Sequence, residues 1–126
     1  MQIEKLDHLV LTVKDIATTS EFYMTALGMK LVTFTGNRKA LTFNTGKINL
    51  HQAGNEFEPK ALRPTPGSAD LCFITKTPVA AVAKHLRAHS IPIIAGPLKK
   101  AGAFGPLLSI YFRDPDGNLI EVSNEE

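Results

Sequence analysis

Short runs in which hydrophobic and polar residues alternate are separated by two stretches with the spacing of an amphipathic helix. The first strand-like run is Asp7–Val13, and a helical stretch from Ile16 to Leu27 follows it. Asp15 stands where an N-cap is expected, and Gly28 stands where helices commonly end. Three more strand-like runs complete this half of the chain: Met29–Thr35, Ala40–Asn44 and Lys47–Gln52.

The second half of the chain repeats this order. Asp70–Thr75 resembles the opening run, and Thr77-Pro78 predicts an N-cap followed by proline in the first turn of a helix. That helix has an apolar stripe, and three strand-like runs follow it: Ile91–Ile94, Leu107–Phe112 and Asn118–Ser123. The pattern predicts an α+β fold in which one domain, residues 1–126, contains two βαβββ modules at about 4–52 and 69–124. A proline-containing loop at 53–68 joins them.

Composition narrows the classes of protein that fit. Hydrophobic residues make up 44% of the 126 residues, which is enough for one compact core, and the single cysteine excludes an intrachain disulfide. The net charge is +2 without a basic run, so nucleic acid is not expected as a partner. No apolar run reaches the ~20 residues that cross a bilayer, and the start lacks a signal-peptide pattern. We therefore expect no membrane association and a cytoplasmic location.

Four residues on the expected strands carry the candidate chemistry. Strand periodicity places His8, His51 and Glu121 on the more polar face of their strands, while the helices would cover the apolar faces. Two imidazoles and a carboxylate suit a divalent metal, although isolated histidines and glutamates on strands are usually only solvated. Asp70 begins the first expected strand of the second module, at the position equivalent to His8 in the repeat. Its carboxylate either binds the metal or orients a ligand histidine, or the residue only begins the strand after a turn.

Three other features have ordinary interpretations. Cys72 lies in an apolar run and is expected to be a small core residue. His85 and His89 share a helical face near the end of a helix and are expected at the surface. Lys99–Pro106 reads as a basic, glycine-containing loop, which either holds an anionic group or is a plain hairpin connection.

Motifs at both ends of the chain resemble a known superfamily. The segment Asp7–Val13, with Phe22-Tyr23 and Leu27-Gly28-Met29, resembles the opening of glyoxalase/bleomycin-resistance/dioxygenase (vicinal oxygen chelate) modules. The segment Phe112–Glu121, which contains the Asp-Pro-Asp-Gly turn, resembles their closing hairpin. Further likeness, to glyoxalase domain-containing protein five and its bacterial relatives, rests on three more segments: 49–51, 57–60 and 109–112.

The resemblance implies a fold, a metal and its ligands. The superfamily pairs βαβββ modules into an incomplete barrel, the glyoxalase-like fold, and holds one divalent ion (Zn, Ni, Co, Mn or Fe) inside. Its ligand positions correspond to His8, His51, Asp70 and Glu121 of this chain. Glyoxalase I enzymes usually have a carboxylate where His51 stands and a histidine where Asp70 stands, so the ligand types are exchanged here.

The function implied is that of a metal-dependent lyase or isomerase, similar to lactoylglutathione lyase. Its substrate would be a small molecule that chelates through oxygen, with a glutathione adduct as one candidate, and Glu121 would serve as the catalytic base. The alternatives are an iron(II)-dependent dioxygenase and a non-enzymatic small-molecule binding or resistance protein. We also expect a homodimer whose sites are shared between chains, because many two-module members pair modules across a two-fold axis.

Overall fold

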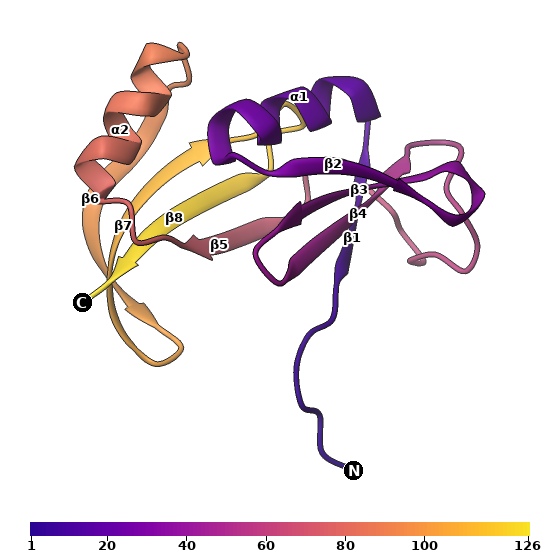
Figure 1. Ribbon diagram of the computed structural model, residues 1–126, viewed down its shortest axis with the longest axis horizontal. Coiled ribbons are helices and arrows are strands. Elements are labelled where there is room, and N and C mark those ends of the chain that lie inside the picture. The colour runs from indigo at the N-terminus through magenta and orange to yellow at the C-terminus, as the bar shows by residue number, and fades with distance from the viewer. The chain divides into compact units, whose positions relative to one another are not determined.

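The computed structural model describes all residues 1–126, and the chain divides into two compact units. Met1–Pro66 forms module 1 and Gly67–Glu126 forms module 2. Each module has one helix and a four-stranded mixed sheet. Figure 1 labels these elements along the chain. The prediction of two βαβββ modules in an α+β chain is confirmed.

In module 1 the strands stand in the order β1-β4-β3-β2. The first strand, β1, pairs in parallel with β4, and the remaining pairs are antiparallel. A short 3₁₀ turn, Thr35–Asn37, joins β2 to β3. The elements are β1 (Leu9–Val13), α1 (Ile16–Leu27), β2 (Lys30–Phe34), β3 (Arg38–Phe43) and β4 (Gly46–Gln52).

Module 2 has the same topology, with the order β5-β8-β7-β6. Here β5 pairs in parallel with β8, while β6, β7 and β8 form an antiparallel meander. The elements are β5 (Asp70–Ile74), α2 (Val79–Ala88), β6 (Ile93–Gly102), β7 (Gly105–Arg113) and β8 (Leu119–Glu125).

Helix α1 begins and ends where the sequence predicts. The Asp15 carboxylate accepts a hydrogen bond from the Thr18 backbone N–H at 2.9 Å, which satisfies one of the free N–H groups of the first turn. The hydrogen bond from the Thr18 hydroxyl, followed by this backbone hydrogen bond, holds the pKa of Asp15 below its usual range. Gly28 adopts φ 65°, the left-handed conformation that ends helices and that glycine accepts without steric cost.

One face of each sheet packs on the helix of its own module. In module 1, Leu11, Val13 and Leu50 are buried on the face that α1 covers, and alternation leaves Val10, Thr12 and His51 on the other face. In module 2 the buried helix-side residues include Ile120 and Val122, so Glu121 lies on the opposite face. The candidate site residues therefore lie on sheet faces that the helices leave open.

A side-chain amide at the end of the last strand ties each module together. The Gln52 amide oxygen accepts a hydrogen bond from the Ile16 N–H at 3.2 Å, and its Nε2 donates to the Lys14 carbonyl at 2.5 Å. In module 2 the Asn124 oxygen accepts from the Val79 N–H at 2.9 Å, and its Nδ2 donates to the carbonyls of Thr75 and Thr77 at 2.8 Å. Both amides cap the first turn of a helix and fix the junction between the first strand and that helix.

The Asp-Pro-Asp-Gly-Asn turn between β7 and β8 is anchored by the buried Asp114. One Asp114 carboxylate oxygen accepts the Asp116 N–H at 2.9 Å and the Asn118 N–H at 3.0 Å. The other accepts the Asn118 side-chain amide at 2.7 Å, and the Asn118 oxygen accepts the Ala69 N–H at 2.8 Å. Gly117 completes the turn with φ 89°. The turn therefore also holds the residue before Asp70 against the start of β8.

Several local predictions are wrong. Helix α2 has Pro78 at its N-cap, without a side-chain capping bond, because Asn124 caps this helix from β8 in place of Thr77. Lys99–Pro106 does connect β6 and β7 as a hairpin, but the expected loop is mostly strand, because Lys99–Gly102 belongs to β6 and Gly105 begins β7. Cys72 is exposed on the open face of β5, where strand alternation places it opposite Leu71 and Phe73. Neither helix is long and apolar enough to cross a membrane.

Replacing Asp114 with alanine removes the acceptor of three hydrogen bonds inside module 2. We expect the free energy of unfolding to fall by about 2–4 kcal/mol, because hydrogen bonds to a charged group are worth ~1.5–3 kcal/mol and their donors would stay buried. Urea denaturation measures the change. Glu21→Ala, on the exposed face of α1, is the control and should change stability by less than ~0.5 kcal/mol. Equal stability of the two variants would contradict this role of Asp114.

Candidate functional site

His8 stands one residue before β1 and is oriented by its neighbour. Its Nδ1 lies 2.8 Å from the Asp7 carboxylate, and the His8 side chain is 42% exposed. The hydrogen bond with His8, followed by the charge of His8, lowers the pKa of Asp7, so this carboxylate is ionised at neutral pH. A carboxylate at Nδ1 fixes the imidazole so that Nε2 is presented to a ligand, which is the usual arrangement of a metal-binding histidine.

His51 lies on β4 and is 7% exposed. Its ring meets the Phe57 ring edge-on with centroids 5.7 Å apart, and the Arg38 guanidinium lies 4.4 Å from the centroid of the same phenylalanine. Burial, and next the positive charge of Arg38, lowers the pKa of His51. The imidazole is therefore neutral at physiological pH, which is the state that binds metals or accepts a proton.

The segment 53–68, expected as a loop between modules, forms one wall of a cavity beside His51. This cavity measures about 230 Å³ and is lined by Val10, Thr12, His51 and residues 59–61. The Lys60 ammonium lies between two carboxylates, 3.4 Å from Glu56 and 3.3 Å from Glu58. These partners raise the pKa of Lys60, so the loop carries a fixed positive charge that is locally balanced.

Glu121 lies on β8 between residues of two neighbouring strands. It pairs with Cys72 on one side and with Tyr111 on the other. Ser123 donates to one Glu121 oxygen at 3.3 Å and is itself 2.6 Å from the Ser109 hydroxyl. Burial, and next the hydrogen bond and charge of Glu121, raises the pKa of Tyr111 to about 12. The tyrosine therefore stays a protonated donor beside Glu121 at neutral pH.

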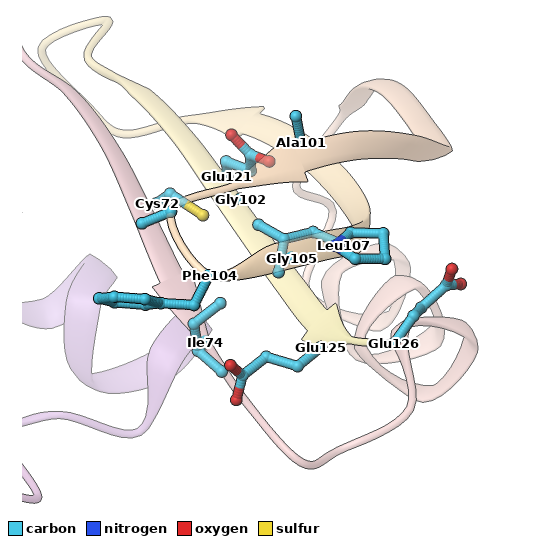
Figure 2. A pocket seen from close by; sticks show the side chains of 12 residues that line it. Cys72, Ile74, Ala101, Gly102, Phe104, Gly105, Leu107, Glu121, Glu125 and Glu126 are labelled. Atoms are coloured by element: carbon cyan, nitrogen blue, oxygen red, sulfur yellow. The ribbon is translucent and has the colours of Figure 1, made fainter.

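Glu121 also lines a cavity of about 390 Å³ within module 2, shown in Figure 2. The walls come from β5, β8 and the hairpin between β6 and β7. Burial raises the pKa of the Cys72 thiol, which lies 3.5 Å from the Ser123 hydroxyl on the same wall, so the cysteine is a neutral thiol there. An apolar cavity with one held carboxylate suits a small organic substrate.

The pairing register identifies Asn49, which the sequence pattern did not single out. Superposing Asp70 on His8 also superposes Cys72 on Val10, and the partners of these two residues are Glu121 and Asn49. The same alignment superposes Asn124 on Gln52, whose amides have matching roles. Asn49, rather than His51, is thus the module 1 counterpart of Glu121.

The amide oxygen of Asn49 is buried and has no hydrogen-bond partner. A buried carbonyl oxygen without a partner costs free energy and is usually explained by a function or by a bound species. The sequence held one signal for this residue, since Asn49 alternates with Ile48 and Leu50 on the polar face of its run, but an asparagine there is commonplace.

Each module carries two of the four predicted site residues. His8 and His51 belong to module 1, and Asp70 and Glu121 belong to module 2. Neither module by itself gathers three or more histidine, cysteine, aspartate or glutamate side chains that could hold a metal ion.

Two βαβββ modules, each with a four-stranded mixed sheet, define the glyoxalase-like class of fold. The sequence model of the Glyoxalase/Bleomycin resistance protein/Dioxygenase superfamily matches residues 5–122, and the chain belongs to this superfamily.

Two curated relatives are similar along nearly the whole chain. Virulence protein STM3117 of Salmonella typhimurium is 60% identical over 123 residues, which cover 98% of this chain and 85% of the relative. Glyoxalase domain-containing protein RDO1 of Mycosarcoma maydis is 56% identical, over 98% of this chain and 70% of the relative. The superposition on the crystal structure of STM3117 covers 100% of both chains, with a TM-score of 0.98 and 59% sequence identity.

More distant structures share the fold alone. Lactoylglutathione lyase from Agrobacterium tumefaciens has a TM-score of 0.72 at 20% identity, over 98% of this chain and 96% of the other. The fosfomycin resistance protein FosX from Listeria monocytogenes, crystallised with Mn(II) and sulfate, has a TM-score of 0.70 at 19% identity, over 99% and 93%.

Replacing Asn49 with leucine tests whether the Asn49 amide stabilises the fold. The side chains are similar in size, and leucine removes the unpartnered oxygen, so we expect the metal-free protein to become more stable by about 1 kcal/mol. Thermal and urea unfolding in the presence of a chelator measure this change. A loss of more than ~1 kcal/mol would show that the amide stabilises the fold, and would remove the reason to assign it to the site.

Proposed function

We propose that this protein binds one divalent metal ion per site and acts as a glyoxalase-like lyase or isomerase on a small substrate with two neighbouring oxygens. The observation that carries the proposal is the setting of Glu121. Its carboxylate lines a cavity large enough for a small organic molecule, and donors on two sides hold it in place. Such a carboxylate can both bind a cation and take a proton from a substrate.

The donor set fits a divalent ion. His8, Asp70 and Glu121 would supply one imidazole and two carboxylates, a combination that suits Zn, Ni, Co, Mn or Fe. The Asp7 carboxylate on Nδ1 of His8 supports a ligand role for this histidine. The unpartnered oxygen of Asn49 lies at the position equivalent to Glu121 and fits an oxygen-binding cation as well.

The fourth ligand is proposed to be His51, with Asn49 as the competing candidate. His51 pairs with Thr12, four positions along β1 from His8, which corresponds to about 13 Å along the strands. Asn49 pairs with Val10 and is half as far from His8 along the strand direction. If Asn49 is the ligand, His51 is left free to act on the substrate as a neutral imidazole.

The residues around Glu121 define its part in the chemistry. A divalent ion bound there would polarise the two oxygens of the substrate and make the carbon next to them more acidic. Ser123 and Tyr111 donate to the Glu121 carboxylate and keep it oriented toward the cavity. The other Glu121 lone pairs can then accept a proton from that carbon and return it to the neighbouring carbon.

The site is proposed to draw on both modules, because each module alone holds only two of the four donors. We propose a homodimer in which His8 and His51 of one chain meet Asp70 and Glu121 of the other. We also propose that the protein is cytoplasmic. We propose further that it is particularly similar to glyoxalase domain-containing protein five and its bacterial relatives. A glutathione adduct is one candidate substrate of this site.

The base role of Glu121 predicts separate effects on metal binding and on proton transfer. Glu121→Gln keeps an oxygen donor, so metal affinity should fall by about tenfold or less, while the exchange of substrate carbon-bound hydrogen for deuterium should slow by about 100-fold or more. Titration calorimetry measures the first effect, and NMR of methylglyoxal hemithioacetals in D₂O measures the second. His8→Ala is the matched variant and should lose metal affinity and exchange together.

Unchanged exchange in Glu121→Gln would remove Glu121 as the base. Oxygen uptake with catechol-like substrates, dependent on iron(II), would favour a dioxygenase in place of the lyase. A wild-type protein that is purified without metal and does not bind any of the five ions would favour a binding protein.

Mixing two inactive variants tests the shared site. His8→Ala and Glu121→Ala each break every site in their own homodimer. In a mixed dimer with shared sites, both lesions fall in one site and the other is intact, so about a quarter of wild-type activity should return after subunit exchange. Sites built within one chain would give no return. A protein that stays monomeric in analytical ultracentrifugation at assay concentrations would exclude the dimer itself.

A further inference from the structure

The cavity beside Glu121 has a second end with a different character. Glu125 lies on the same face of β8 as Glu121, four residues further along, at about 13 Å in the strand direction. It pairs with Leu107, and both residues line the cavity together with Ile74 of β5 (Figure 2). The cavity thus runs from one carboxylate, across an apolar middle, to another.

A phenylalanine stands at the mouth of this cavity. Gly102 and Gly105 pair at the end of β6 and β7, and the two residues between them form the hairpin turn. Phe104 in this turn is 99% exposed and is one of the residues that line the cavity. The turn holds the aromatic ring at the cavity mouth, and the ring is exposed to solvent. It is therefore available to contact a ligand.

The charges on the cavity wall have one sign. Its ionisable residues are Glu121, Glu125, Glu126 and Cys72, and no lysine, arginine or histidine lines it. Lys100 pairs with Leu107 of the cavity wall without lining the cavity itself, and its ammonium lies 5.7 Å from the centroid of the Tyr111 ring. A carboxylate-lined apolar space attracts cationic groups, accepts neutral ones and repels anions.

We infer that this cavity takes an aromatic or other apolar substrate whose tail is cationic or uncharged, and that it discriminates against anionic tails such as those of glutathione adducts. The inference rests on the proposed function, because the oxygens of the substrate lie at the Glu121 end. Phe104 contacts the apolar part of the substrate, and Glu125 selects the charge of the tail. Phe104 and Glu125 are specificity-determining residues of the site.

Three catechols that differ only in their tails form the test: 3,4-dihydroxyphenethylamine (cationic), 4-methylcatechol (neutral) and 3,4-dihydroxyphenylacetate (anionic). We expect the dissociation constants to rise in this order, with about tenfold between the cation and the anion. Phe104→Ala should weaken all three by about fivefold, and Glu125→Gln should reduce the difference between cation and anion to about threefold or less. Calorimetry or ligand-observed NMR is done on both chelator-treated and metal-loaded protein.

Two exposed residues of module 1 provide matched controls. Leu62→Ala removes a side chain that is 92% exposed, and Glu21→Gln removes a carboxylate on α1, and neither should change the binding. Equal affinity for the three tails, tighter binding of the anion, or no effect of Phe104→Ala would overturn the inference. The proposed function fails separately, if metal loading leaves the affinity for all three catechols unchanged while the order of the tails persists.

Discussion

In each module the first strand pairs in parallel with the last, and this pairing fixes where every candidate site residue lies. A parallel pair cannot be closed by a tight turn, so the helix and two further strands lie between its members in the sequence. The register is held at one end by a side-chain amide, Gln52 or Asn124, which caps the helix that follows the first strand. In module 2, Asn118 adds a second tie at the other end, against Ala69. A slip of one residue would turn Glu121 from the open face to the helix-covered face.

The two modules use the same pairing for different chemistry. His8 and Asp70 occupy equivalent positions, as do Asn49 and Glu121. Module 1 therefore offers an imidazole and an unpartnered amide oxygen, while module 2 offers two carboxylates and the cavity beside Glu121. In the proposed site, module 1 would supply the neutral donors, and module 2 would supply the anionic donors and the proton transfer.

Much of the fold could be predicted from the sequence, because the caps and turns that define it are formed by residues close together in the chain. Asp15 and Gly28 cap α1 as predicted, and the Asp114 turn forms where its residues indicate. The sequence also identified Glu121 and His8 on open faces, through strand alternation and motif likeness. The cap of α2 was missed because Asn124 comes from a strand more than forty residues away. The exposure of Cys72, the length of β6 and the equivalence of Asn49 with Glu121 depend on pairing partners, which periodicity does not give.

The account depends on a metal ion held by residues from both kinds of module, and anomalous diffraction from metal-loaded crystals tests this most directly. Data collected on both sides of the absorption edge of the bound metal locate the ion without reference to the expected ligands. The account predicts one peak per site, about 2.0–2.2 Å from Nε2 of His8 and from a Glu121 oxygen. It also predicts that Asp70, and either His51 or Asn49, complete the set. A peak at the exposed His85–His89 pair of α2 alone, or no peak in protein that is saturated with metal in solution, would contradict it.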